Sequence, residues 1–160
     1  RQMCIRDRLE TVQEMGRICA AAEQAEHVEL DADFSSRTVR RIDQSIAMGA
    51  LFTAHQLGAK AIVALTASGS TALWMSRHRI DIPIYALTPS LATQRRMALI
   101  RNVRPLLMDE SDDRDVALAQ AETHLKKRGI VDTGDVYAIT CGEPMGSPGG
   151  SNMLKICRAG

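Results

Sequence analysis

Aromatic side chains are scarce in this 160-residue sequence, which holds one Trp, two Tyr and two Phe. A core of ordinary size must therefore be built from aliphatic residues and methionine, and the length is that of one domain. No run of about 18 apolar residues is present, so no membrane-spanning helix is predicted. No apolar segment typical of a secretory signal occurs near residue 1. We therefore expect a cytoplasmic protein without a membrane partner.

A large excess of charge of one sign is also missing, since the net charge is +1. This balance argues against a dedicated nucleic-acid surface. The four cysteines, Cys4, Cys19, Cys141 and Cys157, form no C-x-x-C pair and have no zinc-like spacing to histidine. We expect free thiols in a reducing compartment and no metal site.

Apolar periodicity predicts helices and strands in alternation. Residues 1–8 are half charged and aperiodic, and we expect them to be a non-native leader before one domain over residues 9–160. Residues Leu9–Glu26 read as a helix, and a second helix is predicted from about Ser36 to Leu57. Its expected apolar stripe consists of Val39, Ile42, Ile46, Ala50, Ala54 and Leu57. Further helices are predicted up to about His78, over Leu91–Ile100, and from about Asp115 to Arg128.

Five short apolar runs predict strands, and helices separate the first four. This alternation predicts an α/β fold, a three-layer sandwich with a five-stranded, mostly parallel sheet and helices on both faces. The last strand follows its neighbour without a helix, so it should be antiparallel and at an edge. The predicted strands are Ala61–Leu65, Ile84–Leu87, Val103–Met108, Val136–Thr140 and Met153–Cys157.

A hydroxyl-rich loop, Thr66-Ala67-Ser68-Gly69-Ser70-Thr71, follows the first predicted strand. Backbone N–H groups are unpaired where a helix begins, and a glycine lets the backbone approach a ligand. The pattern favours an oxyanion site, most simply for a phosphate. The alternative is that Ser68 or Ser70 only caps the next helix. The loop is neither a Walker A motif nor a G-x-G-x-x-G fingerprint.

A second loop, from Gly142 to Ser151, follows the fourth predicted strand and holds four glycines and two prolines. Ligands of such sheets bind beyond the carboxyl ends of the strands. If the first and fourth strands are neighbours, the two loops face each other across one pocket. The alternative is a connection without a ligand, although its length favours function. The expected effector-binding residues are Thr66, Ala67, Ser68, Gly69, Ser70, Thr71, Gly146, Ser147, Gly149, Gly150 and Ser151.

Several motifs resemble the C-terminal domain of pyruvate kinases of the bacterial kind. They are ETVQEM at 10–15, IAMGA at 46–50, LTASGSTA at 65–72, RNVRP at 101–105, KRG at 127–129, TGD at 133–135 and the loop at 142–152. The resemblance covers nearly the whole chain and favours the phosphate site over the cap. It implies a domain that binds a phosphorylated allosteric effector, assembles into a homotetramer and contacts its own catalytic barrel in a glycolytic enzyme.

In that family, phosphoenolpyruvate and ADP react in the barrel, with magnesium and usually potassium. No barrel is present in this sequence, so the resemblance implies no catalytic residue and no cofactor in this fragment. An alternative is a stand-alone phosphosugar or nucleotide sensor of the same fold.

This sequence also departs from eukaryotic members, which hold the second phosphate of fructose 1,6-bisphosphate with a tryptophan and an arginine. The matching positions here are Glu143 and Pro144, and residues 108–116 contain no tryptophan. A carboxylate at this place would repel a second phosphate. We therefore expect a monophosphate effector, a hexose or pentose phosphate or AMP.

Overall fold

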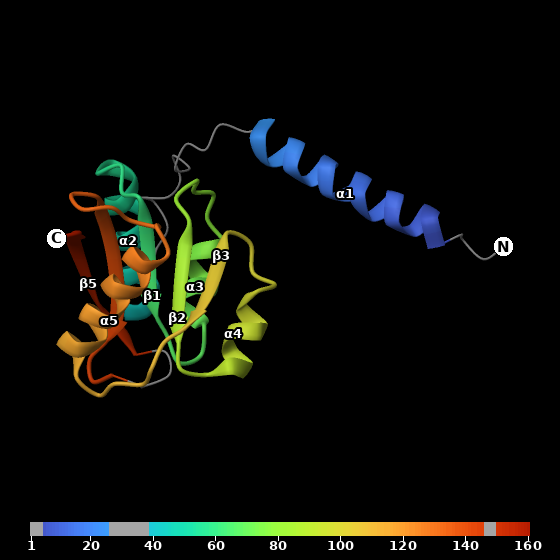
Figure 1. Cartoon of the computed structure of the whole chain (residues 1–160). Helices are drawn as coiled ribbons and strands as arrows, with labels where there is room; N and C mark the ends of the chain where they lie inside the picture. Colours follow the sequence, from blue (N-terminus) through green and yellow to red (C-terminus); the bar gives the residue numbers. More distant parts are fainter. Residues whose placement is uncertain (1–4, 26–38, 146–149) are drawn as a thin grey trace.

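A computed structural model of the chain describes residues 5–25, 39–145 and 150–160. The described helices are α1 (Ile5–Ala25), α2 (Ile42–Gln56), α3 (Ser70–Ser76), α4 (Leu91–Met97) and α5 (Arg114–Lys127). The strands are β1 (Ala61–Leu65), β2 (Ile84–Thr88), β3 (Val103–Leu107), β4 (Val136–Gly142) and β5 (Ser151–Arg158). Figure 1 shows one sheet with helices on both faces, and this three-layer α/β arrangement confirms the predicted fold class.

The five strands form a single sheet in the order β3-β2-β1-β4-β5. The first four are parallel to their neighbours, whereas β5 pairs with β4 in the antiparallel sense. The prediction of an antiparallel edge strand is therefore confirmed. Pro105 lies in β3, the other edge, where a residue without an N–H group is tolerated.

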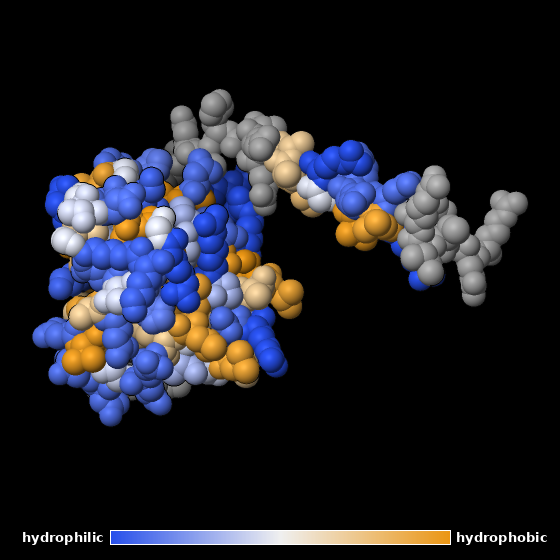
Figure 2. Space-filling view, in the orientation of Figure 1, coloured by the Kyte–Doolittle hydropathy of each residue, from blue (hydrophilic) through white to orange (hydrophobic). Residues whose placement is uncertain are grey.

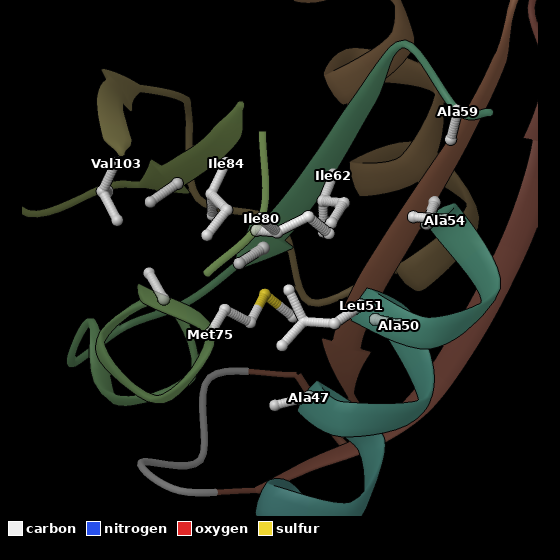
Figure 3. Packing of buried hydrophobic residues seen from close by; sticks show 14 of the residues in the cluster. Ala47, Ala50, Leu51, Ala54, Ala59, Ile62, Met75, Ile80, Ile84 and Val103 are labelled. Carbon is white, nitrogen blue, oxygen red and sulfur yellow. The ribbon is translucent and has the colours of Figure 1, made fainter. Parts of the chain in front are cut away.

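Side chains of β1 alternate between the two faces, as the period of a strand requires. Ile62 and Ala64 point into the core beneath α2, α3 and α4. Figure 3 shows Ile62 and Ile84 above Met75 of α3 and Leu51 of α2. Val63 and its neighbours on the opposite face pack under α5, against Ala117, Leu118, Ala121 and Leu125. A core poor in aromatic residues is thus closed by aliphatic and methionine side chains.

Helix α2 differs from its prediction in both start and orientation. It begins at Ile42, because Arg41 is extended and its guanidinium binds the buried carboxylate of Asp43. Ile42 and Leu57, assigned to the apolar stripe, are exposed, and the buried apolar residues of α2 are Ala47, Ala50, Leu51 and Ala54. Small residues allow α2 to lie close to the sheet, where the predicted stripe would have placed bulkier ones.

Helix α1 lies apart from the sheet in Figure 1. It starts four residues before the predicted Leu9 and therefore includes part of the segment expected to be a leader. Its side chains from residue 8 to residue 22 are exposed, and Figure 2 shows apolar residues along one side of it. They include Leu9, Val12, Met15 and Ile18, each at least 59% exposed. Among the described residues, no helix is long and apolar enough to cross a membrane.

Candidate functional site

The strands β1 and β4 are parallel neighbours, so the loops that follow them meet at one edge of the sheet. A cavity of about 90 Å³ lies between these loops. Residues from three segments line most of it, namely the hydroxyl-rich loop, the segment after β3 and the second loop. They are Thr66, Ala67, Ser68, Ser70 and Thr71, then Met108 to Asp112, then Gly142, Met145 and Ser151, and Leu65, Leu87 and Pro89 complete the lining.

The hydroxyl-rich loop does not use its serines to cap α3. The N-cap residue of α3 is Gly69, in the left-handed conformation with φ 81°, and no side chain makes a capping hydrogen bond there. A β-carbon at Gly69 would lie 2.9 Å from both Cγ and Sδ of Met97. Glycine is therefore required for two reasons, the positive φ and the close approach of α4. The capping alternative is wrong for both Ser68 and Ser70.

Hydrogen bonds within the loop give it a defined shape. The Gly69 N–H donates to Thr66 Oγ1 at 2.8 Å, and the Ser68 hydroxyl donates to Ser70 Oγ at 3.1 Å. The Ser70 N–H contacts Ser68 Oγ at a long 3.4 Å. A hydroxyl that accepts one hydrogen bond still has a proton to donate. Thr66 and Ser70, whose hydroxyl oxygens each accept a hydrogen bond, can thus offer their own protons to an anion in the cavity.

A buried hydroxyl pair joins the two loops behind the cavity. Thr71 Oγ1 and Ser151 Oγ are 2.6 Å apart, and the two residues are 1% and 8% exposed. Thr71 belongs to α3 and Ser151 is the first residue of β5. The position of the hydroxyl-rich loop is therefore tied to the start of the edge strand.

The structure brings most of the described candidate residues together. Gly69 lies in the loop but faces Met97 rather than the cavity. The carbonyl of Gly150 lies 2.8 Å from the point where a β-carbon of Gly142 would sit, so the second loop crosses the end of β4 closely. Gly146, Ser147 and Gly149 lie outside the described residues.

An exposed acidic segment also lines the cavity. Asp109, Glu110 and Asp112 follow β3, whose carboxyl end lies at the same edge of the sheet as that of β1. The sequence could have indicated this position, because β3 was predicted to be parallel and the segment after it should then lie at the same edge of the sheet. In the part of the chain that the structure describes, no lysine, arginine or histidine lines the cavity.

Glu143 is not among the described residues that line the cavity. Its carboxylate accepts a hydrogen bond from Arg114 Nη1 at 2.8 Å, and Arg114 also binds Asp115. These carboxylates raise the pKa of Arg114, and the hydrogen bond from Arg114 lowers the pKa of Asp115. The carboxylates that line the cavity belong instead to the segment after β3.

Cys141 lies at the end of β4, one residue before the cavity, and is fully buried. Burial, with a smaller contribution from Glu143, raises the pKa of its thiol. A raised thiol pKa means little thiolate near neutral pH, so the group packs as a small apolar side chain. In the described ranges, no cluster of three histidine, cysteine or acidic residues could hold a metal ion.

Comparison with known proteins assigns the family. Residues 44–157 match the family described as "Pyruvate kinase, alpha/beta domain". The chain is 33% identical over 148 residues to pyruvate kinase II of Salmonella typhimurium, and 36% identical over 148 residues to a pyruvate kinase of Staphylococcus epidermidis. These matches cover 92% of this chain but only 31% and 25% of the two relatives.

A solved pyruvate kinase from Cryptosporidium parvum has the same fold, with a TM-score of 0.76 and 24% sequence identity. The match covers 91% of this chain and 29% of that structure. The chain thus spans about a third or less of the relatives it matches. On these grounds the chain belongs to the family of pyruvate kinase alpha/beta domains, which in its relatives forms part of a larger protein.

Proposed function

We propose that this chain is the regulatory domain of a pyruvate kinase and that it binds a phosphorylated effector in the cavity at the Thr66–Thr71 loop. In the whole protein, the catalytic barrel would transfer a phosphoryl group from phosphoenolpyruvate to ADP in glycolysis. The effector would change the activity of that barrel, and the domain would take part in a homotetramer in the cytoplasm. Magnesium and a monovalent cation would bind in the barrel rather than here.

The observation that supports this proposal most directly is the conformation of the hydroxyl-rich loop. Its serines do not cap α3, and Thr66, Ser68 and Ser70 instead line a cavity of about 90 Å³ at the carboxyl edge of the sheet. A cavity bordered by several hydroxyls and backbone N–H groups suits an oxyanion. The part of the ligand that carries no phosphate would extend along the acidic segment.

The acidic segment favours an effector with a single phosphate. Asp109, Glu110 and Asp112 line the cavity opposite the hydroxyl-rich loop. Like charges repel, so a second phosphate on that side would weaken binding, whereas sugar hydroxyls can donate hydrogen bonds to carboxylates. A hexose or pentose monophosphate, or AMP, meets this requirement.

Helix α1 supports the expectation of larger assemblies. Its apolar residues Leu9, Val12, Met15 and Ile18 are exposed on the isolated chain. An apolar stripe of this kind normally packs against another surface. The barrel or another subunit would provide that surface in the whole protein.

A thermal-shift assay tests the effector site on the chain itself. The probes are glucose 6-phosphate, ribose 5-phosphate, AMP, fructose 1,6-bisphosphate and inorganic phosphate. At a ligand concentration about 100 times its dissociation constant, linkage predicts roughly 2.7 kcal/mol of stabilisation, which is several degrees in Tm. We expect a shift with monophosphates that is lost in the double variant Ser68→Ala/Ser70→Ala. Tighter binding of the bisphosphate would contradict the charge argument, and a shift that survives the double variant would place the site elsewhere.

A further inference from the structure

Helix α4 contacts the hydroxyl-rich loop through two residues that do not line the cavity. Thr93 Oγ1 donates to the carbonyl oxygen of Ala67 at 3.0 Å, and Arg96 Nη2 donates to the carbonyl oxygen of Ser68 at 2.7 Å. Arg96 Nη2 also contacts Thr93 Oγ1 at 3.5 Å. Two successive carbonyl groups of the loop are thus bound by one helix.

These two contacts determine where the loop N–H groups point. In a trans peptide the C=O and N–H groups point in opposite directions. Because the Ala67 carbonyl points to Thr93, the N–H of Ser68 points away from Thr93, and both Ala67 and Ser68 line the cavity. Because the Ser68 carbonyl points to Arg96, the N–H of Gly69 points away from Arg96 and donates to Thr66 Oγ1.

The second consequence concerns the hydroxyl of Thr66. Its oxygen accepts the Gly69 N–H at 2.8 Å, so its own proton is available for another acceptor. Thr66 lines the cavity. If the Ser68–Gly69 peptide rotated, Thr66 would lose this partner and the loop would lose its set of donors.

We propose that Thr93 and Arg96 are positioning residues that hold the Ala67–Gly69 backbone so that Ser68 N–H and Thr66 O–H can donate to an oxyanion in the cavity. This inference rests on the proposed effector site. Thr93 is 6% exposed, so its contact is shielded from water, whereas Arg96 is exposed and acts through a charge-assisted hydrogen bond. Neither residue lines the cavity.

Arg95 provides a matched control for Arg96. It is adjacent, lies on the same seven-residue helix and is also exposed, so Arg95→Gln removes the same charge from almost the same place. Calorimetry with glucose 6-phosphate and with inorganic phosphate compares Arg96→Gln and Arg95→Gln with the unchanged chain. We expect Arg96→Gln to weaken binding about tenfold and Arg95→Gln to change it by less than about twofold. Arg96→Lys should restore part of the loss, and Thr93→Ser should bind more tightly than Thr93→Val.

A second measurement reports on the conformation of the hydroxyl-rich loop without any ligand. Hydrogen exchange of the Gly69 amide, followed by NMR, should accelerate in Arg96→Gln but not in Arg95→Gln, while the amides of β1 keep their rates. Equal effects of the two arginine variants on binding, or an unchanged Gly69 exchange rate in Arg96→Gln, would overturn the positioning role and leave the effector site intact. If the unchanged chain binds neither probe, the effector site itself fails and the proposed purpose of the positioning fails with it.

Discussion

Two loops in this molecule begin with similar residues and end in different structures. Leu65-Thr66-Ala67-Ser68 and Leu87-Thr88-Pro89-Ser90 each include the end of a buried parallel strand and lead into a helix of seven residues. Ser90 is extended and caps α4, because its hydroxyl accepts the Thr93 N–H at 3.2 Å. Ser68 is not a cap, since the N-cap residue one position later is Gly69.

The difference shows how one glycine changes the use of a serine. In the second loop the serine hydroxyl satisfies a backbone N–H at the start of α4, as an N-cap does. In the first loop the left-handed Gly69 turns the chain into α3, and the Ser68 side chain lies beside the cavity. The same Leu-Thr-X-Ser pattern therefore yields a helix cap in one place and a candidate ligand site in the other.

Replacing Gly69 should have the largest effect, since it would force the first loop out of its conformation. Gly69→Ala places a β-carbon against the fully buried Met97 and demands a positive φ. We expect a loss of about 2–3 kcal/mol in the free energy of unfolding, measured by urea denaturation. Gly49→Ala is the control, because the nearest atom to its β-carbon is Leu154 Cδ2 at an ordinary 3.8 Å. That change lies within a helix and should be neutral or stabilising. Similar losses in both variants would refute the special role of Gly69.

The sequence contained enough information to predict a mostly parallel sheet with an antiparallel edge strand, but it left open whether the first and fourth strands are neighbours. Short apolar strands separated by helices predicted the parallel part of the sheet, and the missing helix before the last strand predicted its antiparallel pairing at an edge. The sequence could not show which of two serine loops is capped, because that depends on the left-handed Gly69 and on its contact with Met97, which is distant in the chain.

Helix α2 shows a second limit of sequence patterns. Apolar or small residues occur on more than one of its faces, so more than one face satisfies the helical period. The sheet selected the face with Ala47, Ala50 and Ala54, and the larger Ile42 became 70% exposed. Close packing against neighbouring elements decided this orientation, and periodicity alone carries no information on it.

Removing the two serine hydroxyls one at a time should separate their roles. The proposed site predicts that Ser68→Ala weakens the binding of glucose 6-phosphate about tenfold, since it removes the hydroxyl that would turn from Ser70 to donate to the phosphate. Its stability should hardly change, because the Ser68 hydroxyl contacts only Ser70, at 3.1 and 3.4 Å, among the hydrogen bonds of the described residues. Ser90→Ala should leave calorimetric binding unchanged. Equal binding by Ser68→Ala and the unchanged chain would remove Ser68 from the site.

The free energy of unfolding should show the reverse order, with Ser90→Ala losing more than Ser68→Ala. Ser90→Ala deletes the hydroxyl that accepts the Thr93 N–H, and loss of such a cap costs about 1 kcal/mol. Ser90→Asn should recover most of this loss, since asparagine is also a good cap. Urea denaturation of the three chains measures the effect. If Ser68→Ala destabilises the chain as much as Ser90→Ala does, the contrast between the two loops does not hold.

The rate of thiol modification should show the smallest effect of the contrast between the two serine loops. Cys141 is fully buried at the end of β4, and burial raises the pKa of its thiol, whereas Cys19 on α1 is exposed. At pH 8 we expect iodoacetamide to modify Cys141 at least about tenfold more slowly than Cys19, with peptide mass spectrometry reporting each site. Gly69→Ala should speed the reaction of Cys141 by loosening the adjacent edge of the sheet, while Ser90→Ala should not. Modification of a buried thiol requires local opening of the structure. If Cys141 reacts at the same rate in Gly69→Ala and in Ser90→Ala, the conformation of Gly69 does not control access to this edge of the sheet.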